Sequence, residues 1–244
     1  MLTIDINCDV GEGVGNESKL LPLISSCNIA CGGHAGDEET MANTIILAKK
    51  HCVKIGAHPS YPDKENFGRK VLTISESKLK KSLKQQLELF QKIIKANNAN
   101  LHHIKAHGAL YNQSAIDKDL ANLFLEVVQD FGNYPIYVPF NSAIEKLALE
   151  INYPIIYEAF ADRNYDGNLK LVSRNQNNSL IEEPKAVLEH IKRMCLERKV
   201  KTIDGQLLPI KAETFCIHGD TPSAFKILTY LHNQLPNQQL KILK

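Results

Sequence analysis

Histidines recur in this chain at the ends of short apolar runs. Four of them, His34, His58, His107 and His218, lie beside small residues in Gly-Gly-His-Ala-Gly, Gly-Ala-His-Pro, Lys-Ala-His-Gly and Ile-His-Gly-Asp. Small neighbours let a ligand approach the backbone, and histidine changes its protonation state near neutral pH. We therefore expect at least two of the four to do chemistry, although any one of them could be a hydrogen-bonded structural residue.

Acidic and amide side chains alternate along the first apolar run. In Asp-Ile-Asn-Cys-Asp the period of two puts Asp5, Asn7 and Asp9 on one face of a strand. Buried carboxylates are costly unless a cation, a metal or hydrogen-bond donors meet them. Lys105, which shares strand parity with His107, is the expected cation. We expect Asp9, nearer the strand end, to be functional and Asp5 to be a structural acid bonded to backbone.

These side chains could also hold a metal ion. Two histidines together with Asp9 would leave a coordination position open for water, as catalytic zinc sites do. The close pair Cys27 and Cys31 is not expected to bind zinc, because no second cysteine pair follows at zinc-site spacing. The six cysteines are instead expected to be reduced core thiols.

Seven apolar runs end in polar clusters, and helical patterns separate them. The runs are Ile4–Asp9, Ser26–Gly32, Val53–Ala57, His103–Ala106, Ile136–Pro139, Ile155–Phe160 and Thr214–Ile217. A strand that ends in reactive residues and then leads into a helix is typical of a parallel (β/α) barrel with its site at the carboxyl-end rim. Seven units rather than eight predict an irregular or incompletely closed α/β barrel. The 244 residues suffice for one such domain over 1–244.

Helix and turn signals locate the connections between these strands. Asp37 and Thr221 are the expected N-caps of two helices. The pair Asp204-Gly205 lies between short β-like runs and predicts a surface hairpin. The amphipathic patterns predict helices over about 38–52, 75–95, 115–131, 142–150, 184–199 and 221–234.

Composition indicates the cellular location and the classes of binding partner that are not expected. With 29 basic and 27 acidic residues and lysines spread along the helices, no nucleic acid partner is expected. No apolar run reaches the roughly 18 residues of a membrane span, so we expect no membrane association and a cytoplasmic location. Asn16 stands where a dinucleotide fingerprint needs its third glycine, and Gly-Lys-Ser/Thr is absent. An ATP site would be non-standard or lie on another polypeptide.

Six segments carry the motifs of the chain in order, namely Asp5–Glu12, Asn28–Asp37, Ile55–Asp63 with Phe67–Arg69, Lys105–Asn112, Glu158–Arg163 with Tyr165–Gly167, and Cys216–Pro222. Together they resemble the LamB/YcsF family, the A subunits of prokaryotic 5-oxoprolinase. The resemblance implies a barrel akin to the glycoside hydrolase/deacetylase superfamily. It also implies ATP-dependent opening of 5-oxo-L-proline to L-glutamate in a complex with B and C subunits, with Mg²⁺ accompanying ATP.

Site roles are assigned within these segments as a hypothesis. Asp9 with His34 or His58 would transfer protons, and Lys105 and His107 would stabilise oxyanion or phosphoryl charge. An arginine would bind the substrate carboxylate through its bidentate fork. The expected substrate-binding residues are Glu12, Asp37, Arg69, Tyr111, Asn112, Asp162, Arg163, His218 and Asp220.

The strand ends should bring most of these groups into one cleft. Because rim groups are not packing groups, replacing Asp9 or His58 should lower turnover and leave thermal stability nearly unchanged. Two other classes stay open. A metal-dependent deacetylase would act on an N-acetyl sugar without ATP, whereas a non-catalytic regulatory subunit would tolerate changes at the rim.

Overall fold

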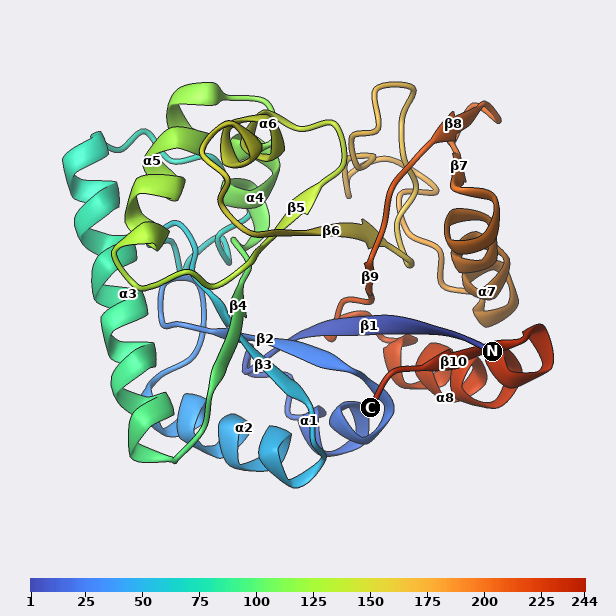
Figure 1. Cartoon of the computed structure of the whole chain (residues 1–244), viewed down its shortest axis with the longest axis horizontal. Helices are drawn as coiled ribbons and strands as arrows, with labels where there is room; N and C mark the ends of the chain where they lie inside the picture. Colours follow the sequence, from blue (N-terminus) through green and yellow to red (C-terminus); the bar gives the residue numbers. More distant parts are fainter.

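Seven parallel strands close into a barrel in this computed structural model, which describes residues 1–244 (Figure 1). Neighbouring strands follow the order β1-β2-β3-β4-β5-β6-β9, and β9 pairs with β1 to complete the ring. The predicted seven-stranded parallel barrel is confirmed, and it is closed. The strands are β1 (Leu2–Val10), β2 (Ser26–Ala30), β3 (Lys54–His58), β4 (Leu101–Ile104), β5 (Ile136–Pro139), β6 (Ile155–Phe160) and β9 (Thr214–Cys216).

The barrel is irregular around β4. This strand meets β5 through a single residue pair, Ile104 with Ile136, and the register between β3 and β4 shifts next to Gly56. A Cβ added at Gly56 would collide with the imidazole ring of His103. The absence of a side chain at Gly56 therefore makes room for this ring inside the barrel.

One further strand lies outside the predicted set. The strand β10 (Leu240–Ile242) runs parallel to the start of β1, with Leu2 opposite Leu240. The barrel partner β9 pairs with β1 only from Asp5 onward, so the first residues of β1 would otherwise be an open edge. The carboxyl-terminal segment covers that edge.

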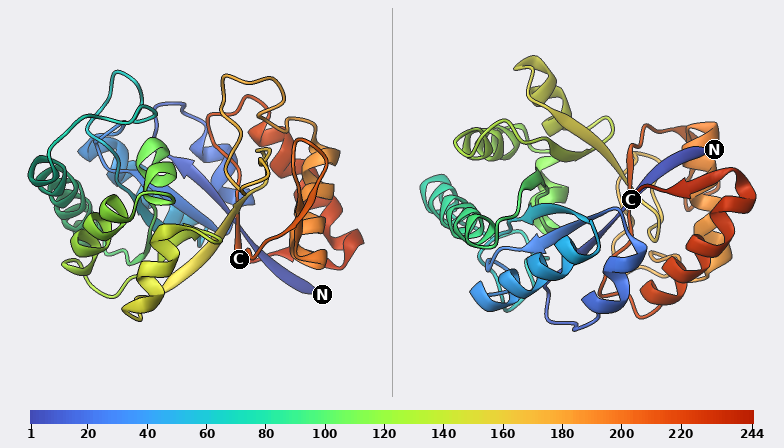
Figure 2. Two further views of the ribbon diagram at one scale, coloured as in Figure 1. Left: turned by 90° about the horizontal axis from the view of Figure 1, so that it is seen from above. Right: turned by 60° about the horizontal axis from the view of Figure 1, so that its bottom comes forward.

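Helices surround the strands, with α2 and α3 on one side and α7 and α8 on the other (Figure 2). All six predicted helices start within three residues of their expected positions. The sixth, α8, begins at Ala224, and Thr221 is not its cap, because the Thr221 hydroxyl lies 3.4 Å from Asp162. The helices are α1 (Glu17–Leu20), α2 (Glu38–Lys50), α3 (Glu76–Ala96), α4 (Gly108–Ser114), α5 (Lys118–Gln129), α6 (Ala143–Glu150), α7 (Pro184–Lys192) and α8 (Ala224–Gln234).

Alternation along β1 separates the apolar layer from the barrel interior. Ile4, Ile6 and Cys8 belong to the hydrophobic core, where buried helix residues such as Met41 of α2 and Leu83 of α3 also lie. The intervening acids and amide of β1 are buried as well, but they face other polar side chains. The interior of this barrel is thus a polar network, which fixes the groups at its mouth.

The predicted hairpin is present, and the prediction for the thiols is partly wrong. Strands β7 (Lys199–Lys201) and β8 (Leu207–Pro209) pair antiparallel around Asp204-Gly205. All six cysteines are free, but Cys52 is exposed and Cys195 is only partly buried. The other four are core thiols.

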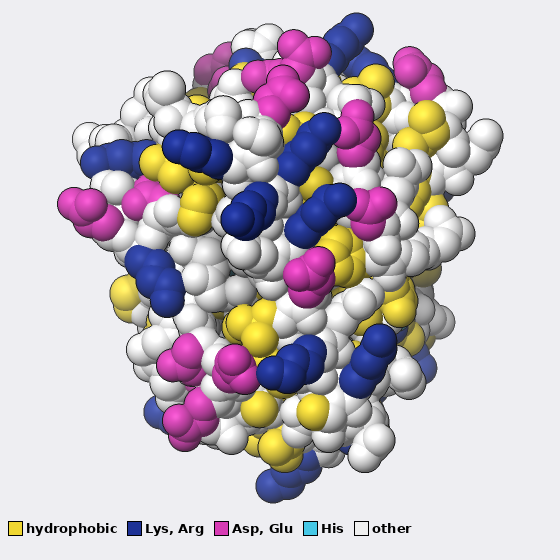
Figure 3. Space-filling model, turned by 90° about the vertical axis from the view of Figure 1, so that its left-hand side faces the viewer, with side chains coloured by type: hydrophobic (Ala, Val, Ile, Leu, Met, Phe, Trp, Pro, Cys, Tyr) yellow, Lys and Arg dark blue, Asp and Glu magenta, His cyan; other side chains and the backbone are white.

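The surface over α3 carries interleaved charges (Figure 3). Lys80 and Lys84 of α3 form ion pairs with Glu126 of α5 and with Asp130 just beyond it, at 2.5 and 2.6 Å. Neither sign forms a continuous patch on this face. No helix combines the length and the apolar character needed to cross a membrane.

Candidate active site

A hydrogen-bond network fills the lower part of the barrel. Asp5 accepts hydrogen bonds from the hydroxyls of Ser26 and Thr214 at 2.6 and 2.7 Å, and Lys54 Nζ lies 3.1 Å away. The partners of Asp5 are thus side chains rather than the expected backbone groups. Asn7 Nδ2 donates to Thr214 Oγ1 at 2.9 Å and continues the network upward.

The next layer holds Asp9 in one orientation. Asn28 Nδ2 donates to Asp9 Oδ1 at 2.7 Å and to Asn7 Oδ1 at 2.8 Å. Asn28 Oδ1 in turn accepts from His103 Nε2 at 2.7 Å. Because Oδ1 of Asp9 is occupied, Oδ2 is the oxygen that faces the mouth of the barrel.

Lys105 is buried in the barrel, as strand parity predicts. Its Nζ lies 3.0 Å from Asp9 Oδ1 and 2.8 Å from Glu158 Oε1, and only 2 % of its side chain is exposed. Burial alone would lower the pKa of Lys105, but Asp9 and Glu158 raise it well above its usual range. Burial alone would raise the pKa of Asp9, but Lys105 and His58 hold it well below its usual range. Lys105 is therefore a permanent cation between two carboxylates.

His58 and His107 face each other above Asp9. His58 Nδ1 lies 2.8 Å from the carbonyl oxygen of Lys105, and His107 Nε2 lies 2.9 Å from that of Phe67. Carbonyl oxygens only accept hydrogen bonds, so both of these nitrogens carry hydrogen. The inner nitrogens, His58 Nε2 and His107 Nδ1, are 3.0 Å apart and would both present lone pairs if the rings were neutral. A cation between them, either a proton or a metal ion, would relieve the repulsion of these lone pairs.

Glu12 and His34 form a second acid–imidazole pair beside these rings. His34 Nε2 lies 2.9 Å from Glu12 Oε1, which is also 3.4 Å from His107 Nδ1. The His34 and His107 rings stack with centroids 3.6 Å apart. Burial and the nearby charge of Asp9 raise the pKa of Glu12 well above its usual range, and burial lowers the pKa of His34 to about 2. Glu12 can thus exchange a proton closer to neutral pH than an ordinary glutamate.

A third pair closes the cluster on the side of β6 and β9. Asp162 is fully buried and accepts hydrogen bonds from the backbone N–H and Nδ1 of His218, at 2.9 and 3.0 Å. Burial alone would raise the pKa of Asp162, but His218 lowers it. One ring nitrogen of His218, Cys216 Sγ and one carboxylate oxygen of Asp9 lie within 4.8 Å of one another. The structure therefore brings together the rim residues expected to converge, namely Asp9, Glu12, His34, His58, His107, Asp162 and His218.

The two arginine candidates differ in their surroundings. Arg163 is buried, and its guanidinium donates to the carbonyl oxygens of Ser179 and Val172, so it holds a loop rather than facing the cluster. Arg69 is more exposed and forms an ion pair with Asp220. Because Arg69 follows β3 and Asp220 follows β9, this ion pair joins loops from two separate strands.

Three further predicted substrate-binding residues lie away from the histidine cluster. Asp37 is exposed and caps α2 by accepting from the backbone N–H of Thr40 at 2.8 Å. Asn112 is exposed on α4 and makes no hydrogen bond to the cluster, because the inward position of that helix turn is taken by Tyr111. Tyr111 is buried with its ring centre 6.0 Å from Lys105 Nζ. It therefore lies beside the lysine rather than at the mouth.

Sequence reasoning missed Glu158 and Asn28 as partners of the site. Glu158 shares strand parity with Asp162, and Asn28 shares it with Ser26, whose register partner on β1 is Asn7. The period of two along these strands was the available signal.

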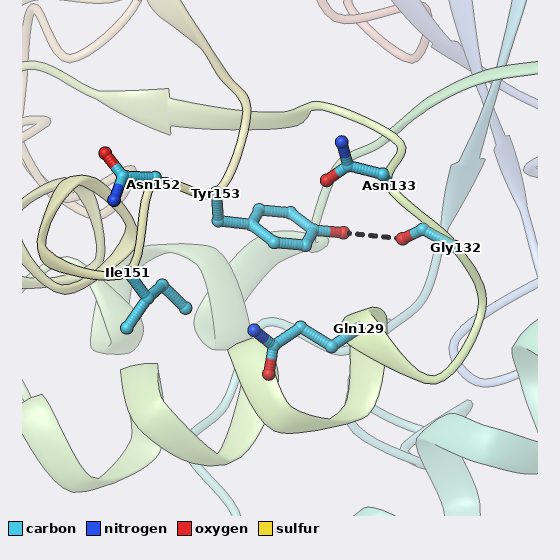
Figure 4. A pocket seen from close by; sticks show the side chains of 6 residues that line it. All are labelled: Gln129, Gly132, Asn133, Ile151, Asn152 and Tyr153. Carbon is cyan, nitrogen blue, oxygen red and sulfur yellow. Dashed lines mark hydrogen bonds between the residues drawn. The ribbon is translucent and has the colours of Figure 1, made fainter.

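A surface hollow elsewhere carries none of this chemistry. It has a volume of about 320 Å³ and is lined by Gln129, Gly132, Asn133, Ile151, Asn152 and Tyr153 (Figure 4). Its residues precede β5 and β6, so it lies at the amino ends of the strands, opposite the histidines. No side chain in it ionises near neutral pH, and the Tyr153 hydroxyl donates to the Gly132 carbonyl oxygen at 3.1 Å.

Comparison with known proteins supports the family resemblance that the six sequence segments indicate. The chain is 37% identical over 247 residues to the A subunit of 5-oxoprolinase from Staphylococcus epidermidis, covering 99% of this chain and 98% of that protein. It is 38% identical over 243 residues to the A subunit of 5-oxoprolinase from Haemophilus influenzae, covering 99% of both.

A solved structure shares the fold at full length. The crystal structure of the lactam utilization protein from Thermus thermophilus superposes with a TM-score of 0.91 at 31% identity and covers 99% of both chains. The profile of the LamB/YcsF family matches residues 4–244. This chain belongs to the LamB/YcsF family.

Proposed function

We propose that this chain is the A subunit of an ATP-dependent 5-oxoprolinase, which hydrolyses 5-oxo-L-proline to L-glutamate together with B and C subunits. The observation that carries the proposal is that acid–imidazole pairs from five strands meet at one barrel mouth in a chain whose full-length relatives are named as the A subunit of 5-oxoprolinase. ATP, as its Mg²⁺ complex, would be the co-substrate. Six unpaired cysteines and the use of ATP favour a cytoplasmic setting.

The need for ATP follows from the substrate. A five-membered lactam is a resonance-stabilised amide with little ring strain, so its carbonyl carbon is a poor electrophile. Transfer of the γ-phosphoryl group from ATP to the amide oxygen would release ADP and give an imidoyl phosphate. Water could then add to its carbon, and protonation of the ring nitrogen would let the C–N bond break and leave an acyl phosphate. A second water would hydrolyse this acyl phosphate to glutamate and phosphate. The barrel would supply a base for that water and positive charge for the developing oxyanion.

The geometry distinguishes the groups that could fill these roles. Glu12, with its raised pKa and its contact to His34, is suited to take a proton from water and return it to the departing ring nitrogen. Lys105 is enclosed by Asp9 and Glu158, so it would keep Asp9 negatively charged rather than contact the substrate. His58 and His107 lie closer to the mouth.

Arg69 is the better of the two candidates for the substrate carboxylate. Its guanidinium is held over the Phe67 ring at 4.7 Å and pairs with a carboxylate already, that of Asp220. A substrate carboxylate would take the place of Asp220 in this pair. Arg163 has no comparable freedom, because its guanidinium is bonded to backbone carbonyls.

The Arg69→Lys variant is expected to raise the KM for 5-oxoproline by about 10-fold with little change in kcat, because lysine cannot form the bidentate contact. Steady-state kinetics of the reconstituted complex measure this effect. Arg198→Lys, at an arginine that follows α7 and lies outside the cluster, is the matched control. A lowered kcat at unchanged KM would assign Arg69 to the chemical step instead of binding.

Turnover is expected to require the B and C subunits. The chain has acidic and histidine side chains at the rim that could transfer protons, but it has no recognisable phosphate-binding loop. Glutamate and ADP release from 5-oxoproline is measured for the chain alone, for the partners alone and for the complex, each with and without ATP. Only the complete mixture with ATP should be active. Stoichiometric release of both products by the isolated chain would contradict the division of labour.

A further inference from the structure

We propose that Asp9, His58 and His107 form a binding site for one divalent transition-metal ion at the mouth of the barrel. His58 Nε2 lies 3.0 Å from His107 Nδ1 and 3.5 Å from Asp9 Oδ2. Ligand atoms of all three residues lie within 4.8 Å of one another. A tetrahedral ion with bonds of about 2.0–2.1 Å separates neighbouring ligand atoms by about 3.3 Å. These two separations bracket that value.

The surrounding groups already orient each side chain as metal ligands are oriented. His58 and His107 each use their outer nitrogen to donate to a backbone carbonyl, which leaves the inner lone pairs facing each other. Asp9 Oδ1 accepts from Lys105 and Asn28, so its Oδ2 points to the same place. All three residues are at most 5 % exposed, and their orientation is therefore fixed before any ion arrives.

A metal ion explains these contacts better than a proton does. A proton between His58 Nε2 and His107 Nδ1 would satisfy the two nitrogens only. The 3.5 Å separation between His58 Nε2 and Asp9 Oδ2 is too long for an ordinary hydrogen bond, so the carboxylate oxygen would remain without a close partner. An ion bound to all three atoms gives each of them a partner and leaves coordination positions open for water.

Two neighbouring sets of three residues are less suited to bind the same ion. In the set of Asp9, Cys216 and His218, His218 Nδ1 is bonded to Asp162, so only its Nε2 is free to bind an ion. Cys216 Sγ lies 3.2 Å from Lys105 Nζ, and this positive charge disfavours a metal ion at that sulfur. In the set of Glu12, His34 and His107, Glu12 and His34 are hydrogen-bonded to each other at 2.9 Å. Glu12 would instead lie beside the bound ion.

The donor set indicates the class of ion. Two imidazole nitrogens and one carboxylate suit zinc, cobalt or iron better than magnesium or calcium, which prefer oxygen ligands. The ion would supply Lewis acidity next to Glu12. This inference does not depend on the proposed reaction, because binding is measured on the isolated chain without substrate or ATP.

The test uses the full chain after dialysis against a chelator, with Zn²⁺ or Co²⁺ as the only added ligand. Calorimetry should show one ion bound per chain, and Co²⁺ should give the visible absorption of a four- or five-coordinate site. His58→Ala and His107→Ala should weaken binding by about 10²-fold or more. His58→Gln and His107→Gln, which keep most of the side-chain volume, are measured alongside, with circular dichroism to confirm folding.

Two controls decide where the ion binds. His232→Ala removes an exposed helix histidine and should leave the affinity unchanged. His218→Ala should also retain binding, because that ring belongs to the rival set of ligands. The proposal is overturned if the wild-type chain binds neither ion, which would leave a shared proton between the rings. Loss of binding in His218→Ala with retention in His107→Ala would overturn it as well.

Discussion

Replacing Asp9 with asparagine is expected to lower glutamate formation by the reconstituted complex by about 10²-fold or more. The substitution removes the negative charge that faces His58 Nε2 at 3.5 Å, whether that charge orients a proton or binds a metal ion. It keeps an oxygen that can accept from Asn28 and Lys105. Lys105 also retains Glu158, so the protein should fold.

The stability of the Asp9→Asn variant shows whether Asp9 behaves as a solvated rim group or as a buried ion-paired group. A rim group in solvent would leave the melting temperature unchanged, but Asp9 is 5 % exposed and ion-paired. We therefore expect a loss of about 1–3 kcal/mol in the free energy of unfolding, measured by urea denaturation. Turnover is then compared at equal folded fraction with Asp130→Asn, an exposed acid on the surface near α3. Wild-type turnover in Asp9→Asn would remove this residue from the mechanism.

The strands could be located from the sequence because each apolar run ends at a cluster of polar residues. The run Ile155–Phe160 was located to the residue, since buried apolar residues lead directly into the polar Asp162. The run at β4 was predicted at 103–106, two residues after the observed strand Leu101–Ile104, because the partly buried His102 interrupts the apolar pattern after Leu101. The strand β10 was missed because its role comes from the exposed edge of β1, which is a tertiary property.

The candidate site was predictable in its members and less so in its contacts. Parallel strands bring their carboxyl ends to one face, so the convergence of the histidines follows from topology alone. The pairing of Glu12 with His34 does not, because Glu12 lies in a loop after β1 whose path no local pattern determines. Asp37 makes the contact of the predicted N-cap and none with the histidine cluster, and an N-cap aspartate and a ligand-binding aspartate look alike in sequence.

Replacing Lys105 with methionine is expected to destabilise the fold and abolish turnover together. Methionine is close to lysine in length, so packing against Phe160 and Tyr111 should largely remain. The ammonium, however, is the cation that both Asp9 and Glu158 contact, at 3.0 and 2.8 Å. Removing one partner of a buried ion pair costs about 3–5 kcal/mol, because the remaining charges are left without compensation. Urea denaturation measures this loss, and the reconstituted assay should show a fall of about 10²-fold or more.

A second substitution separates charge from packing. In the variant Lys105→Met with Glu158→Gln, one of the two uncompensated carboxylates is gone, so part of the lost stability should return, as a double-mutant cycle would show. Lys80→Met removes an exposed lysine that pairs with Glu126 and should change stability by less than about 1 kcal/mol. If Lys105→Met were as stable as Lys80→Met, the buried carboxylates would have to be neutral in the folded protein. The negative charge assigned to Asp9 would then be wrong.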